Sequence, residues 1–215
     1  MALFPEERYI MYHFTVPMAL MDFVPVIFFG ITAVLLIQDL SNKMNKAVFT
    51  LFAAGCFDVF LAGFCKALWK LLYAANVCNF VALEEMFMPV NSIGLLLVGL
   101  SLIGMLCCKR KDVAVFSAAP AVFSGSFVFI MMMVVGLGGM CAVLSILAAK
   151  MKKKGTIVLF VLSFVCAMGM GYMSSQDSTL AWVNWAEQSI NIVSQGCLMW
   201  GALILHKANL AEFKI

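Results

Sequence analysis

Acidic, amide and hydroxyl side chains recur at helical spacing in the last apolar stretch of the sequence. Glu187, Asn191 and Ser194 stand four and then three residues apart, so a helix would place them on one face. A polar stripe on a membrane helix is expected to face the bundle interior or a water-filled cavity, because an ionisable side chain in lipid is costly. Together these oxygens could bind a cation or a small polar solute.

A second polar face begins at two adjacent glutamates, Glu84 and Glu85. Glu84 and Asn91 are seven residues apart and share a helical face. Pro89 lies between them and should loosen the helix and free a backbone carbonyl. We expect Glu85 and Asn91 to contribute to the polar site. The alternative is that both glutamates, which closely follow the polar loop 76–79, lie in water at the membrane interface.

Two aspartates and two lysines complete the ionisable groups of the apolar stretches. Asp58 lies centrally in the apolar run 47–75 with no loop in reach, and Asp22 lies within the first run. Lys66 and Lys70 are expected to snorkel from the end of a helix, with a pair between Lys66 and a glutamate of the next helix as the alternative. The candidate binding residues are Asp22, Asp58, Glu85, Asn91, Glu187, Asn191 and Ser194.

The elements that carry these residues must lie in a membrane. The chain is 64% hydrophobic and 12% charged, whereas a soluble domain carries about 25% charged residues. Its mean hydropathy is +1.04. Long apolar segments that suffice to cross a bilayer predict an all-α, polytopic membrane helix bundle, one domain over 1–215. The six segments are 9–37, 47–75, 80–108, 113–149, 156–173 and 180–205.

The fourth segment, 113–149, leaves the number of crossings open. It is longer than one crossing needs and hardly long enough for two, and a proline and a Ser-Gly-Ser sequence interrupt it. One crossing gives six alternating helices and puts the basic loops 109–111 and 150–154 on opposite faces. A hairpin gives seven crossings and gathers every basic loop on one face. Length favours six and charge favours seven; we expect six, with the arm 113–124 undecided.

A weak internal repeat relates residues 85–107 to residues 187–209. Glu85 falls on Glu187 without a gap, and a serine and two glycines follow at the same spacing in both. This favours a duplication of three helices. Directly fused halves would be related by an axis in the membrane plane, whereas an extra crossing would make them parallel. The halves would comprise residues 1–111 and 112–215.

Metal and cofactor chemistry find little support in the sequence. Eight cysteines are scattered without a CxxC pair, and the only histidines, His13 and His206, lie near opposite ends. A zinc site needs clustered ligands. We therefore expect no metal and no cofactor.

Three classes of function remain, and the first is favoured. It is a small transporter or channel for a cation or small polar solute, coupled to protons through Asp58, Glu85 or Glu187. The second is an accessory or structural subunit of a larger membrane complex. The third, an intramembrane lipid enzyme, lacks a nucleophile or metal motif, so we expect no enzyme. Expected partners are the lipid bilayer and the solute, with no nucleic acid. A homo-oligomer or a partner subunit stays open, and the expected location is the cell membrane.

Overall fold

The computed structural model describes residues 15–107, 126–173 and 181–213, and in these residues the protein is all-helical. Six helical spans in them are long and apolar enough to cross a membrane. This confirms the predicted helical membrane bundle and the architecture of a multi-pass membrane protein. The helices are α1 (Val16–Met21), α2 (Phe23–Leu40), α3 (Lys46–Ala74), α4 (Ala82–Glu85), α5 (Phe87–Cys107), α6 (Ser126–Lys150), α7 (Lys154–Met173) and α8 (Ala181–Lys207).

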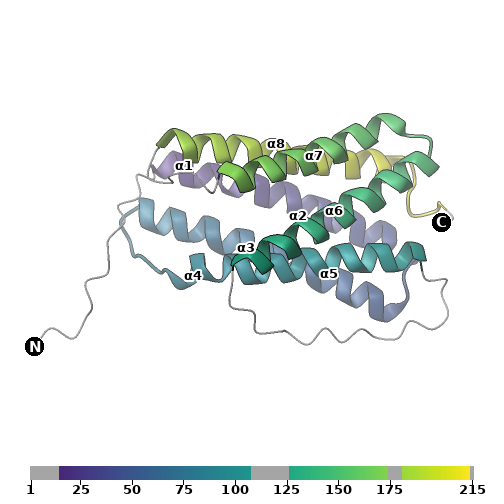
Figure 1. The fold of residues 1–215 in the computed structure, drawn as a ribbon, viewed down its shortest axis with the longest axis horizontal. Coiled ribbons are helices and arrows are strands. Elements are labelled where there is room, and N and C mark those ends of the chain that lie inside the picture. The colour runs from purple at the N-terminus through teal and green to yellow at the C-terminus, as the bar shows by residue number, and fades with distance from the viewer. Residues whose placement is uncertain (1–14, 108–125, 174–180, 214–215) are drawn as a thin grey trace, which may run out of the picture.

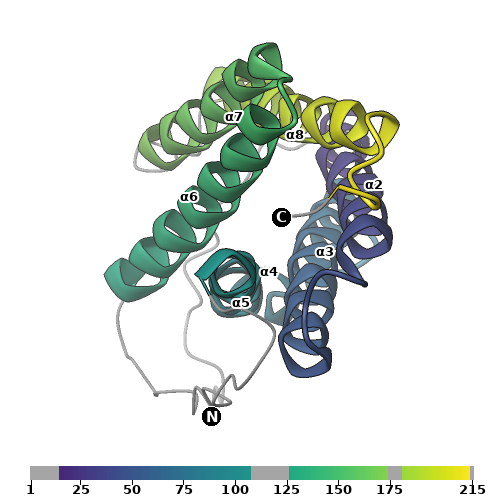
Figure 2. The same ribbon diagram turned by 90° about the vertical axis from the view of Figure 1, so that its right-hand side faces the viewer.

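The six long helices stand in a ring. Going round it, the order is α2, α3, α5, α6, α7 and α8, and α8 returns to α2 (Figure 2). Helix α1 continues into α2 and α4 continues into α5, and each pair makes one span. Each of the six long helices therefore has one face toward the central axis of the ring.

Local signals set the helix ends at the predicted polar loops. The Asn45 side chain caps α3 by accepting a hydrogen bond from the Val48 N–H at 2.9 Å. Asn76, just after α3, and Lys152, just after α6, have φ values of 55° and 59°. This left-handed conformation ends a helix and suits asparagine well.

Helices α5 and α6 run in the same direction. A Cβ on Gly136 would lie 2.4 Å from the backbone of Leu95, and one on Gly139 would lie 3.1 Å from Ile103. Later residues of α6 thus contact later residues of α5, as two parallel helices require. Figure 1 shows both helices beginning near the end where α3 finishes and running to the other end.

This parallel pair corrects the expected alternation of the third and fourth segments. Cys107 ends α5 at one end of the bundle and Ser126 begins α6 at the other (Figure 1). The last residue of α5 and the first residue of α6 therefore lie toward opposite ends, whereas alternating helices would place them at the same end. The basic loop 109–111 and the arm 113–124 lie outside the described residues.

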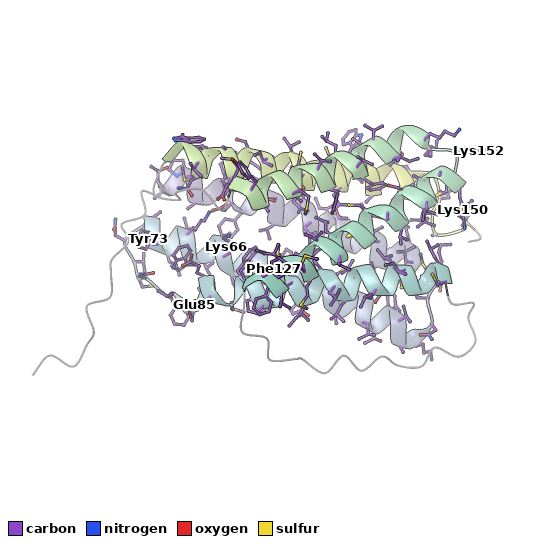
Figure 3. All side chains as sticks on the ribbon, in the orientation of Figure 1. Lys66, Tyr73, Glu85, Phe127, Lys150 and Lys152 are labelled. Atoms are coloured by element: carbon purple, nitrogen blue, oxygen red, sulfur yellow. The ribbon has the colours of Figure 1, made fainter. Side chains whose placement is uncertain are left out.

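The two ends of the ring differ in charge. We call the end where α2, α5, α6 and α8 finish the basic end. Lysines gather there in the loops and at the helix termini, as Lys150 and Lys152 illustrate (Figure 3). The other lysines that the structure describes at this end are Lys43, Lys46, Lys153, Lys154 and Lys207.

The helix directions also bear on the internal repeat. Helices α2, α5, α6 and α8 run one way, and α3 and α7 run the other way (Figure 1). Two halves of three helices would therefore share one orientation, as in the parallel alternative and not as in the one with an axis in the membrane plane. The duplication itself stays a prediction.

The half of the ring next to the basic end is filled by a hydrophobic core. Leu36, Phe52, Leu102, Leu144 and Leu205 are fully buried there, and they come from five different helices. These packed side chains block the axis of the ring on this side.

Candidate functional site

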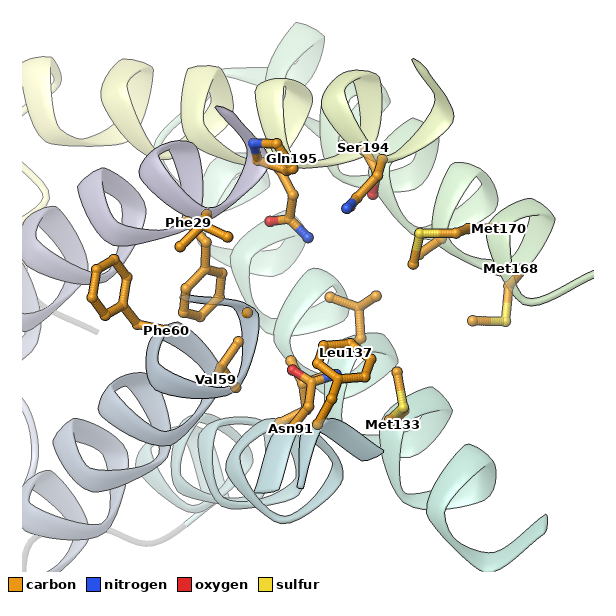
Figure 4. Close-up of a pocket in the computed structure, with 17 residues that line it drawn as sticks. Phe29, Val59, Phe60, Asn91, Met133, Leu137, Met168, Met170, Ser194 and Gln195 are labelled. Atoms are coloured by element: carbon orange, nitrogen blue, oxygen red, sulfur yellow. The ribbon is translucent and has the colours of Figure 1, made fainter. Parts of the chain in front are cut away.

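A cavity of about 480 Å³, the outer cavity, lies between the helices toward the end opposite the basic end. A smaller cavity of about 130 Å³, the inner cavity, continues it toward the middle of the ring (Figure 4). All six long helices contribute side chains to both cavities. Val26, Ala167 and Asn191 line both, so the two cavities adjoin.

A buried ion pair stands at the wall of the outer cavity. The Lys70 ammonium nitrogen lies 3.0 Å from Asp22 Oδ2, and the two side chains are 8% and 10% exposed. Asp22 begins α2 and Lys70 lies in the last part of α3. The pair therefore ties these two helices together at the cavity end, and removing one partner would leave an uncompensated charge.

Lys66 lies one turn before Lys70 and also faces the outer cavity. Its ammonium nitrogen is 4.2 Å from the centre of the Phe87 ring, which is a cation–π contact. The carboxylates of Glu84 and Glu187 are among the opposite charges that act on it. Both lysines thus line the outer cavity.

Four amide side chains line the two cavities. Gln188 and Asn191 reach the outer one, and Asn91, Asn191 and Gln195 reach the inner one. None of the four makes a side-chain hydrogen bond with another described residue, and the Oε1 atoms of Gln188 and Gln195 are buried without a partner. Buried amides normally find partners, so these are free to bind a solute.

The rest of the inner cavity is lined mainly by apolar side chains, including aromatic rings and methionine thioethers. Ser194 is buried beside them and donates a hydrogen bond to the Ser163 carbonyl oxygen at 2.8 Å, which holds α8 against α7. Aromatic rings and thioethers adapt to the face of a planar ligand. Those that line the inner cavity are Phe29, Phe60, Phe87, Met133, Met168 and Met170 (Figure 4).

Five of the predicted site residues line these cavities and two do not. Asp58 packs where α3 meets α5, since a Cβ on Gly94 would lie 2.9 Å from the Asp58 Cβ. Glu85 is exposed on the outside of the bundle (Figure 3), whereas its neighbour Glu84 lines the outer cavity. The lining residues are Asp22, Asn91, Glu187, Asn191 and Ser194.

The sequence argument missed the lysines and the glutamines. Lys66 and Lys70 are one helical turn apart, a spacing that could have indicated a shared inward face. Gln188 and Gln195 extend the polar stripe of α8 beyond the residues that we selected. We predicted Glu85 as the site residue, whereas its neighbour Glu84 lines the outer cavity.

A second polar cluster closes the basic end. His206 Nδ1 lies 2.8 Å from Oδ1 of Asp39, which is 3% exposed. Lys43 donates hydrogen bonds to the carbonyl oxygens of Ala211, at 3.0 Å, and of Phe213. Burial lowers the pKa of Lys43, and the Asp39 carboxylate opposes that shift. The cluster links α2 and its following loop to α8.

Comparisons with known proteins leave the site to be interpreted from its own geometry. No family model, curated protein or solved structure matches the chain. Among the described residues, no group of three or more His, Cys, Asp or Glu side chains could hold a metal ion. The cysteines of these residues are free thiols.

Proposed function

We propose that the chain is a transporter for a small polar solute. The observation that carries this proposal is a cavity lined by all six long helices, with charges at its outer part and amides farther in. Polar side chains at this depth are costly in a membrane and mark solute pathways. Many secondary transporters likewise hold their solute near the bilayer midplane, between two halves of the protein.

The sealed basic end favours a carrier over an open channel. The cavity reaches Leu95 and Leu137, and beyond them the buried leucines of the core block the axis. A carrier exposes its site to one side at a time. The described arrangement fits a state that is open toward the cavity end and closed at the basic end.

Proton coupling would run through Glu187 in this proposal. Glu187 lines the outer cavity, whereas Asp58 and Glu85 do not. The Asp22 carboxylate is already balanced by Lys70. A proton gained or lost by Glu187 would change the charge facing Lys66, and solute binding would change with it.

The direct test is solute entry into vesicles. Purified protein is reconstituted, and stopped-flow light scattering follows the entry of glycine, ribose and uracil at two pH values. At least one probe should enter faster than into empty vesicles. Ala167→Trp should abolish that difference, because Ala167 lines both cavities.

The matched control is Val165→Trp on the same helix. Val165 is 58% exposed on the outside of the ring, so the added ring would lie in lipid and entry should persist. Entry equal to that of empty vesicles for every probe would contradict a transport function. It would favour the accessory-subunit alternative.

A further inference from the structure

The charged side chains that line the outer cavity are three carboxylates, Asp22, Glu84 and Glu187, and two ammonium groups, Lys66 and Lys70. Asp22 and Lys70 form a buried pair. Lys66 lies against the face of Phe87 and within the field of Glu84 and Glu187. A charged solute would compete with these contacts: an anion would meet the two glutamates, and a cation would meet the lysines.

Among the described residues that line the inner cavity, by contrast, none is charged. Its polar groups are the amides of Asn91, Asn191 and Gln195 and the hydroxyl of Ser194. A charge moved there would lose its hydration without gaining a counter-charge, which is strongly unfavourable. A neutral solute would meet no such penalty.

The amides approach the inner cavity from two sides. Asn91 comes from α5, and Gln195 comes from α8 across the ring (Figure 4). Each amide offers both donors and an acceptor. A solute that carries both donors and acceptors on its edges can therefore satisfy side chains that otherwise lack partners.

The apolar walls add a constraint on shape. Phe29, Phe60 and Phe87 line the same cavity as Met168 and Met170. Aromatic faces and thioether sulfurs both contact flat rings favourably. A puckered ring of the same polarity would make fewer such contacts.

We infer that the solute is an uncharged, flat ring with amide-like edges, the chemical class of the nucleobases and the aromatic carboxamides. This inference rests on the proposed function, because it names the solute of that same site. Amides that lack partners provide recognition, and the rings and thioethers enclose the solute. The charges of the outer cavity lie at the entrance and do not hold the solute.

Calorimetry on the full-length protein in detergent tests the class. Uracil, adenine and benzamide are the flat neutral probes. Dihydrouracil keeps the uracil edge on a puckered ring, orotate adds a carboxylate to the flat ring, and glycine is a zwitterion. At least one flat neutral probe should bind, and uracil should bind more tightly than dihydrouracil and orotate. Failure of all three flat probes, or equal or tighter binding of orotate or glycine, would overturn the inference.

Substitutions of the amide residues test whether the solute binds to them. Gln195→Met and Asn91→Leu keep side-chain size and remove hydrogen bonding, so each should weaken binding about 3- to 10-fold, the effect of one neutral hydrogen bond. Gln38→Met is the matched control, since Gln38 is exposed on the outside of α2, and it should leave binding unchanged. If Asn91→Leu does not fold, Gln195→Met decides alone. Unchanged binding in Gln195→Met would overturn the assignment.

The two proposals fail in different ways. Binding of a flat neutral probe without its entry into vesicles would contradict transport and keep the solute class. Entry of glycine with no binding of any flat probe would keep transport and overturn the class.

Discussion

Gly99 and Gly136 bring the backbones of α5 and α6 into direct contact. A Cβ on Gly99 would lie 2.4 Å from the Gly136 carbonyl oxygen, closer than any real side chain could approach. Small residues allow such close packing between membrane helices. This contact therefore holds the two parallel helices together.

Gly136→Ala should therefore destabilise the protein. The added methyl group would meet Leu95 backbone atoms at 2.4 Å, so the helices must separate. We expect a loss of about 1–3 kcal/mol, the usual cost of overpacking. Thermal unfolding in detergent measures it. Gly104→Ala is the control on α5: nothing lies within 4 Å of its Cβ position, so its stability should be unchanged or slightly higher.

Cysteine accessibility tests the helix directions. Single cysteines at Ser41 and Lys152 should both react with a membrane-impermeant maleimide from one side, because both lie in loops at the basic end. A cysteine at Val77, in the loop after α3, should react only from the other side. From the excess of lysines we predict that the basic end faces the cytoplasm. Labelling of Ser41→Cys and Lys152→Cys from opposite sides would contradict the parallel arrangement of α5 and α6.

Much of the fold could be predicted because bilayer thickness constrains each helix by itself. Apolar length and polar loops were enough to place the six spans. The direction of α6 was not predictable in this way. The segment 113–149 is longer than one membrane crossing needs and too short to indicate two crossings clearly. The charge pattern, which favours all basic loops on one face, was the better guide to the ends of α5 and α6.

The site was predictable only to the extent that one helix determines it. The stripe of Glu187, Asn191 and Ser194 lies on one helix, and its spacing alone brings it to the cavity. Glu84 and Glu85 are adjacent, about 100° apart around a helix. A small error in the predicted rotation of the helix is therefore enough to turn the wrong glutamate toward the cavity. The pairing of Asp22 with Lys70 depends on which helices are neighbours, and no spacing within one helix contains that information.

The Asp22–Lys70 pair should show strong coupling in a double-mutant cycle. Lys70→Met leaves the buried Asp22 carboxylate without its partner and should lower stability by about 3 kcal/mol. Asp22→Asn combined with Lys70→Met removes both charges and should recover most of that loss. Thermal unfolding of the single and double variants gives the coupling energy. Lys154→Met, at an exposed position, should have no effect. Additive losses would show that the two side chains act independently.

The Asp39–His206 contact should hold the basic end closed. It joins α2 to α8 at 2.8 Å, and Asp39 is 3% exposed. Asp39→Leu removes the contact without leaving a buried charge, because the groups that lose the carboxylate are the half-exposed His206 and Lys43 in the loop after α2. If the protein alternates between two states, weakening this contact should raise the fraction open at the basic end.

Cys141 reports that opening. It is buried in the core between the inner cavity and the basic end, at 5% exposure. In a protein that keeps Cys141 as its sole cysteine, Asp39→Leu should speed its reaction with N-ethylmaleimide on the order of tenfold, the value of one charge-assisted hydrogen bond. Gln38→Leu, at the adjacent exposed position, should leave the rate unchanged. A rate in Asp39→Leu equal to that of the parent protein, with solute entry intact, would show that the core alone keeps this end closed.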